Sequence, residues 1–207
     1  MPLRELAGPI GRLEALLDTP ETNVRAAVVF AHPHTEYGGT MHTKVVYQAA
    51  KALARIGCAV LRFNFRGAGA SAGSFTNGPG EIEDFRAALD FMHDRYPSAR
   101  MWAGGMSFGS YVGMTAGAAD PRVSTLIGIA LPVTRYDFAP VATSTKAKFF
   151  IHGERDEICG FKEINAFYAR AAEPKELVVI DSSDHLFNGV VSEVADAIEQ
   201  LLGDFTT

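Results

Sequence analysis

Short apolar runs alternate with longer amphipathic stretches along most of this chain. Several of the short runs are apolar at consecutive positions, a pattern typical of strands that are buried on both faces within a parallel sheet. We predict strands at residues 28–31, 59–65, 101–103, 126–131, 148–151 and 177–180.

Between these runs, apolar residues recur at the spacing of a helix. In residues 81–96, Ile82, Phe85 and Leu89 lie three or four positions apart, and acidic residues occupy the first turn. An apolar stripe that starts near residue 43 is followed by Gly57, a residue type that commonly ends helices. We predict helices at residues 43–56, 81–96, 107–119, 162–172 and 190–202.

The order of these elements indicates the fold class. Residues 3–17 predict one or two antiparallel strands, and strands and helices alternate from there to the end. Such alternation is typical of an open, mostly parallel sheet with helices on both faces, the doubly wound α/β class. The chain has no internal repeat, low-complexity tract or linker, so we expect residues 1–207 to form a single domain.

In such sheets, ligands bind at the carboxyl ends of the strands. The segments that directly follow the predicted strands are polar or rich in glycine, and we expect them to lie together at one edge. They read HPHTEYGGT (32–40), RGAGASAGS (66–74), GGMSFG (104–109), HGERDEI (152–158) and DSSDHLF (181–187).

Three of these segments carry the residues of a nucleophilic site. Ser107, Asp156 and His185 each follow a different predicted strand. A hydroxyl is a poor nucleophile at neutral pH without an adjacent base, so His185 is the candidate base and an acid must orient its ring. Other carboxylates nearby that could orient the ring are Glu154, Glu157 and Asp184.

The glycines around Ser107 favour the same reading. Gly105-x-Ser107-x-Gly109 lies between a predicted strand and a predicted helix. A serine on that sharp turn is strained, and side chains at the flanking positions would collide with the strand and the helix. The turn also places the serine at a helix N-terminus, which favours developing negative charge. An ordinary surface turn would not need this context.

Four longer runs resemble a known family. AHPHTEYGGTMHTKVV, LRFNFRGAGASAGSF, GPGEIEDFRAALDF and GMSFGSYV are similar to the small, lidless serine hydrolases of the α/β-hydrolase fold, close to dienelactone-hydrolase-like esterases. The resemblance implies a serine carboxylesterase that works through an acyl-enzyme, with Ser107, Asp156 and His185 as its triad. Dienelactone hydrolases themselves use cysteine where this chain has Ser107, and relatives often have phenylalanine at the position of Met106.

The resemblance also places the oxyanion hole. One donor is the backbone N–H of Phe108, directly after the nucleophile, and the other comes from the loop after residues 28–31. Many hydrolases have His-Gly-x there, so the second donor aligns with the N–H of His34, with Thr35 as the other choice. Pro33 has no N–H and is excluded.

Chain length between two strands predicts an open site. Only sixteen residues, 132–147, separate two of the predicted strands, which is too few for a cap domain. We therefore expect short-acyl esters as substrates. Candidate pocket walls are Met106, Phe108, Phe138, Ile158 and Phe187.

Composition narrows the partners further. A net charge of −5 and a pI near 5.7, without a basic cluster, argue against nucleic acid or an anionic membrane. The start MPLRELAG does not read as a signal peptide, and Cys58 and Cys159 suggest neither a disulfide framework nor a zinc site. We expect a cytoplasmic enzyme that needs no metal or cofactor and acts on a small molecule.

Alternative functions remain open at this point. The same triad could act on thioesters or lactones, and some members of this fold only bind. Gly67-x-Gly69-x-x-Ala72 matches a dinucleotide fingerprint, although no helix follows promptly; the same stretch also matches the R-G-x-G-x-S loop of α/β-hydrolases. His32-x-His34 with His42 could suggest metal ligands, but no acidic ligand is suitably spaced.

Overall fold

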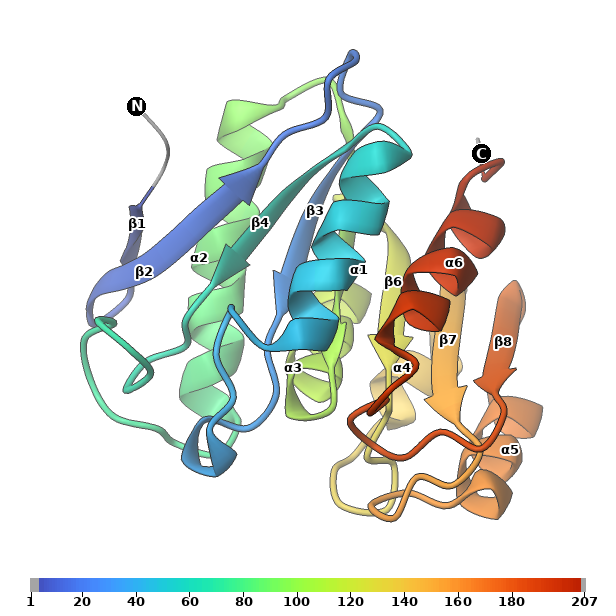
Figure 1. Cartoon of the computed structure of the whole chain (residues 1–207). Helices are drawn as coiled ribbons and strands as arrows, with labels where there is room; N and C mark the ends of the chain where they lie inside the picture. Colours follow the sequence, from blue (N-terminus) through green and yellow to red (C-terminus); the bar gives the residue numbers. More distant parts are fainter. Residues whose placement is uncertain (1–3, 206–207) are drawn as a thin grey trace.

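The computed structural model describes residues 4–205 and contains one eight-stranded sheet (Figure 1). The strands lie in the order β1-β2-β4-β3-β5-β6-β7-β8; β1 and β2 are antiparallel to their neighbours, and β3 to β8 run parallel. Their bounds are β1 Glu5–Gly8, β2 Gly11–Asp18, β3 Ala26–Ala31, β4 Cys58–Phe63, β5 Arg100–Met106, β6 Val123–Ile129, β7 Ala147–Gly153 and β8 Lys175–Ile180.

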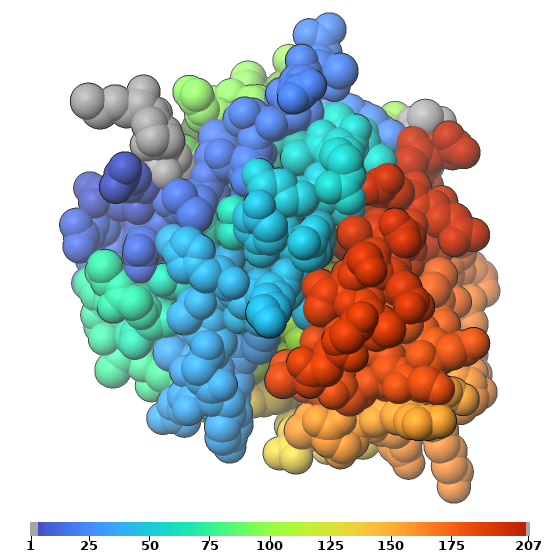
Figure 2. Space-filling view, viewed as in Figure 1, coloured from blue at the N-terminus to red at the C-terminus, as the bar shows by residue number. Residues whose placement is uncertain are grey.

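Helices cover both faces of the sheet, as Figure 1 shows. Helices α1 and α6 lie side by side on one face, which is the face nearer the viewer in Figure 2, and α2 to α5 pack on the other. The bounds are η1 Thr35–Tyr37, α1 Lys44–Arg55, α2 Pro79–Arg95, α3 Phe108–Ala119, α4 Ala139–Thr143, α5 Phe161–Arg170 and α6 Val191–Leu202. The predicted α/β fold class is confirmed, and residue 3 of the first predicted strand region lies outside the described residues.

Most element boundaries differ from the sequence prediction by one to three residues, and for the end of β5 and the start of α2 the structure shows the physical reason. Strand β5 continues to Met106 because Gly104 and Gly105 pair with β3 on one side and β6 on the other. Helix α2 begins at Pro79, where a missing N–H costs no helical bond. The Glu81 side chain then accepts the Gly78 N–H at 2.7 Å and caps this end.

Close contact between β5 and α3 positions the turn that joins them. A Cβ atom on Gly113 would lie 2.5 Å from the Gly104 carbonyl oxygen, and one on Gly117 would lie 2.5 Å from the Ala103 Cβ. Real Cβ atoms do not approach so closely, so these glycines let the helix lie directly against the strand. The turn at Ser107 is thereby fixed against the centre of the sheet.

The segment between β6 and β7 carries no cap domain. It holds only the short helix α4 and runs close to the ends of the strands (Figure 1). None of the helices in residues 4–205 is both long and apolar enough to cross a membrane.

Candidate active site

Ser107 lies on a strained turn between β5 and α3. Its backbone has φ of 54° and ψ of −123°, a conformation that L-residues rarely adopt. A Cβ atom on Gly105 would lie 2.4 Å from the Gly109 carbonyl oxygen, and one on Gly109 would lie 2.4 Å from the His32 carbonyl oxygen. The two glycines of the motif are therefore required by close backbone approach on both sides of the serine.

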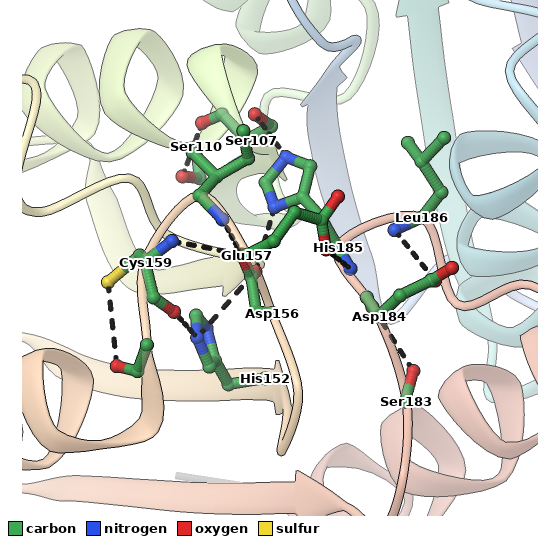
Figure 3. A network of polar contacts seen from close by, with 12 residues as sticks. Ser107, Ser110, His152, Asp156, Glu157, Cys159, Ser183, Asp184, His185 and Leu186 are labelled. Atoms are coloured by element: carbon green, nitrogen blue, oxygen red, sulfur yellow. Dashed lines mark hydrogen bonds and ion pairs between the residues drawn. The ribbon is translucent and has the colours of Figure 1, made fainter.

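Ser107, His185 and Asp156 form a hydrogen-bonded chain (Figure 3). His185 Nε2 lies 2.8 Å from Ser107 Oγ, and His185 Nδ1 lies 2.7 Å from Asp156 Oδ2. All three residues are largely buried: Ser107 is 9% exposed, His185 7% and Asp156 4%. This is the arrangement in which an imidazole can take the serine proton.

The environment of Asp156 keeps it ionised. Burial by itself raises the pKa of this carboxyl, but the hydrogen bond from His185 and the Cys159 N–H outweigh it, and the pKa lies below its ordinary value. Oδ1 accepts the N–H groups of Ile158 and Cys159 at 2.8 and 2.9 Å. Oδ2 remains available to orient His185.

The three competing carboxylates make other contacts around the same loop. Glu154 accepts the Ser182 N–H at 2.8 Å, and Glu157 accepts the backbone N–H of His185 at 3.2 Å. Asp184 accepts the backbone N–H groups of residues 186 and 188. All three hold the loop that carries His185, and none of them meets its ring.

His34, which carries the candidate second oxyanion donor, packs against Phe108 through its side chain. The His34 and Phe108 rings pack with centroids 5.2 Å apart. Among the described residues, neither backbone N–H has a hydrogen-bond acceptor. Gly39 donates its N–H to the His34 carbonyl at 3.0 Å and closes the turn that follows. Both N–H groups are thus free to donate to a bound oxygen.

His32 orients the peptide that carries the His34 N–H. Its Nδ1 lies 2.6 Å from the Pro33 carbonyl oxygen, and its Nε2 accepts the Phe65 N–H at 3.0 Å. Because the C=O and N–H of a trans peptide point in opposite directions, holding the Pro33 carbonyl turns the His34 N–H away from His32. Burial lowers the pKa of His32 to about 4 despite the carbonyl contact, so the ring is neutral.

The loop after β4 is tied to the same region. Asn64 accepts the Met41 N–H at 2.8 Å and donates to Glu14 at 2.7 Å. This loop folds back on itself, with the Gly67 N–H bonded to the Ala72 carbonyl, and the next helix begins only at Pro79. The glycines that match a dinucleotide fingerprint therefore do not open a helix. The sequence pattern indicated no role for Asn64 and only a metal-ligand role for His32, because the contacts of Asn64 with Met41 and Glu14 and of His32 with Phe65 join segments far apart in the chain.

The candidate pocket walls lie deeper than expected. Met106 and Phe187 have no exposed surface and belong to the core beneath α1 and α6, and Phe138 is 4% exposed. Met106 is the last residue of β5, whereas Phe138 precedes α4 and Phe187 lies in the loop between β8 and α6. All three side chains pack into the cores on the two faces of the sheet. Phe108 is also buried, and Ile158 remains partly exposed.

Two partly exposed aromatic residues pack against Phe108 instead. The ring centroids of Phe75 and Tyr136 lie 5.3 and 5.5 Å from that of Phe108. Tyr136 also donates its hydroxyl to Asn77 at 3.1 Å, which joins the loops after β4 and β6. Neither residue is predicted from the sequence, because nothing local marks an aromatic residue in a loop as a neighbour of Phe108.

Known proteins similar to this chain include serine hydrolases. A family model described as serine aminopeptidase, S33, matches residues 22–143. An uncharacterized protein of Rickettsia prowazekii (strain Madrid E) is 33% identical over 211 residues, covering 98% of this chain and 89% of that protein.

Solved structures extend this similarity to the whole fold. An alpha-beta serine hydrolase homologue from Coxiella burnetii is 35% identical, with a TM-score of 0.91 over 96% of this chain and 95% of that one. A serine hydrolase without a lid from Xanthomonas campestris is also 35% identical, with a TM-score of 0.89 over 98% and 93%.

The fold and these matches define an α/β-hydrolase. The chain belongs to the serine hydrolases of this fold, in the family described as serine aminopeptidase, S33, and it is similar to members that lack a lid. The resemblance to lidless serine hydrolases that the sequence indicated is confirmed.

Proposed function

We propose that this chain is a serine carboxylesterase that hydrolyses small, short-acyl esters through an acyl-enzyme intermediate. The observation that carries the proposal is the chain of contacts from Ser107 Oγ through the His185 ring to Asp156 Oδ2, at 2.8 and 2.7 Å. Only an adjacent base makes a serine hydroxyl a useful nucleophile at neutral pH. The membership of the chain in the serine α/β-hydrolases supports the same class of reaction.

In the first step, Ser107 Oγ attacks the ester carbonyl carbon while His185 Nε2 takes the hydroxyl proton. Asp156 holds the ring by its Nδ1–H and stabilises the imidazolium. The carbonyl oxygen becomes negative and accepts the N–H groups of Phe108 and His34. The imidazolium then protonates the leaving alkoxide. In the second step, His185 takes a proton from water, the hydroxide attacks the acyl carbon, and the proton returns to Ser107.

Short acyl groups fit the exposed rim of the site. Tyr37, in the same loop as His34, is 85% exposed, and Leu186, next to His185, is 49% exposed. Two open hollows on the described surface lie at the β1–β2 hairpin and between β8 and α6, away from the triad. A long acyl chain would therefore leave much of its apolar surface in water, so it would gain little affinity from its length.

Other acyl compounds react through the same two steps. Thioesters and lactones are the alternative substrates, and amides enter the test because the matching family model is described as an aminopeptidase. The partner we propose is a small-molecule ester. Cys58 and Cys159, both free and buried, agree with the reducing cytoplasm that we propose as its location.

A substrate panel tests the proposal. We expect the highest kcat/KM on p-nitrophenyl acetate or butyrate and lower values through to laurate, with an alanine p-nitroanilide as the amide comparison. Fluorophosphonate labelling of the wild type, absent in Ser107→Ala, assigns the reactive serine. A maximum on laurate would contradict the open-site argument. Serine-dependent turnover of a thioester, lactone or amide alone would replace the substrate class.

A further inference from the structure

A second histidine lies behind the acid of the candidate triad. His152 is the penultimate residue of β7, its side chain has no exposed surface, and the reaction steps above do not use it. Its Nε2 lies 2.7 Å from the Cys159 carbonyl oxygen and 3.6 Å from Asp156 Oδ2 (Figure 3). The ring therefore contacts the segment that carries the acid.

Cys159 is held through both of its backbone polar groups. Its N–H donates to Asp156 Oδ1 at 2.9 Å, and its carbonyl accepts from His152. The Ile158 N–H donates to the same Oδ1 at 2.8 Å. Fixing Cys159 thus fixes two donors on Oδ1, and the orientation of the carboxylate follows from them. Oδ2 is then directed at His185 Nδ1.

These contacts define the protonation of His152. A carbonyl only accepts, so Nε2 carries the hydrogen, and Nδ1 has no partner among the described residues. Burial lowers the pKa of His152 and outweighs the raising effects of the Cys159 carbonyl and Asp156. The ionisable groups that act on the ring are Asp156 and His185. A neutral ring holds the turn without competing as a cation for the Asp156 carboxylate.

We propose that His152 is a positioning residue for the acid of the triad. Its Nε2–H holds the turn from Asp156 to Cys159 in the form that brings Asp156 Oδ2 to hydrogen-bond distance of His185. This inference rests on the proposed serine-hydrolase function, and it adds a residue that acts through Asp156 without touching the substrate.

Three substitutions separate this role from simple filling of the core. In His152→Gln the amide nitrogen extends as far as Nε2 and can donate to the Cys159 carbonyl, in His152→Asn it is one methylene too short, and His152→Leu has no donor. The readouts are the second-order rate of fluorophosphonate labelling at Ser107, kcat/KM on p-nitrophenyl acetate, and the pH profile of each. Thermal unfolding checks that each variant is folded.

We expect His152→Asn and His152→Leu to label and turn over about tenfold more slowly, the rate factor of one lost hydrogen bond. The acid limb of their pH–rate profiles moves to lower pH, because a misaligned carboxylate stabilises the imidazolium of His185 less well. His152→Gln stays within about twofold of the wild type, with its limb unmoved. A loss of packing alone would reduce rates without moving the limb.

The proposal is overturned if the Gln and Asn variants behave alike, or if all three keep the wild-type limb and labelling rate. If His152→Leu does not fold, the Gln and Asn pair decides, because both side chains are polar and differ only in reach. Failure of the proposed function looks different. In that case Ser107→Ala keeps its labelling, or labelled wild-type protein hydrolyses no ester, whatever stands at position 152.

Discussion

His185 Nε2 lies 2.8 Å from Ser107 Oγ, although the two residues are 78 positions apart in the chain. The serine is carried by the turn between β5 and α3, and the histidine by the loop after β8. Parallel strands bring these segments to one edge of the sheet, where a base can meet a hydroxyl. The first two predictions test this pair and its acid.

Replacing the nucleophile removes activity and leaves the fold. We expect Ser107→Ala to lower kcat on p-nitrophenyl acetate by about 10⁶-fold, the loss typical of removing such a serine. Ser107→Gly should be equally inactive but more stable than Ser107→Ala by about 1 kcal/mol, because glycine accepts this backbone conformation without strain. Steady-state kinetics and denaturant unfolding measure the two effects. Near-wild-type turnover in either variant would remove the serine from the mechanism.

Asp156→Asn, which removes the charge of the acid, should reduce kcat by about 10³- to 10⁴-fold while the fold persists. An amide cannot stabilise the imidazolium, and its N–H favours the wrong tautomer of His185. The matched control is Glu157→Gln, which changes only the acceptor of the His185 backbone N–H and should cost less than tenfold. Equal losses in the two variants would mean that the acid has been assigned to the wrong residue.

Stability should fall in mild acid through His32. The pKa of His32 is lowered to about 4 in the fold from an ordinary value of 6.5, so the unfolded chain takes up the proton first. Its contribution is complete above pH 6.5 and is lost as pH falls towards 4, by about 3 kcal/mol over that range.

The variant His32→Asn isolates this effect. Asparagine can still donate to the Pro33 carbonyl but does not titrate in this range. Urea unfolding at pH 7 and pH 4.5 should therefore show a smaller loss of free energy of unfolding in the variant than in the wild type. Identical losses in the two proteins would mean that His32 is not the group responsible.

The buried ion pair that joins the loop after β4 to α2 should contribute more to the free energy of unfolding than an exposed pair on α2. The Arg66 guanidinium forms a two-point contact with Asp84, at 3.0 and 2.7 Å, and the Asp84 side chain has no exposed surface. Asp84→Asn leaves the Arg66 charge buried without its partner and should cost about 3 kcal/mol or more of unfolding free energy.

The control for that prediction is Glu83→Gln. Glu83 pairs with Arg86 on the solvent side of α2, with both side chains about half exposed. Such pairs contribute little, so the change should stay within about 0.5 kcal/mol. Denaturant unfolding of both variants checks the difference, and a similar cost for the two would contradict the burial argument.

The sequence by itself determined the order of strands and helices and the segments that meet at the site. Apolar runs and helical stripes are local signals, so six strands and five helices could be predicted within a few residues of their observed bounds. Gly105 and Gly109 marked the turn at Ser107 because close backbone approach excludes larger residues there. The segments that follow the strands could also be predicted, because the apolar runs that mark the strands are local signals.

Only the tertiary structure decided which side chains meet. The sequence offered four acidic residues that could orient His185. Packing brings Asp156 to the ring, whereas Glu157 accepts the backbone N–H of the histidine. His32 and His152 acquired their contacts with the oxyanion loop and the acid in the same way. A hydrogen bond needs its two atoms at about 3 Å, and a sequence pattern does not specify such distances between segments far apart in the chain.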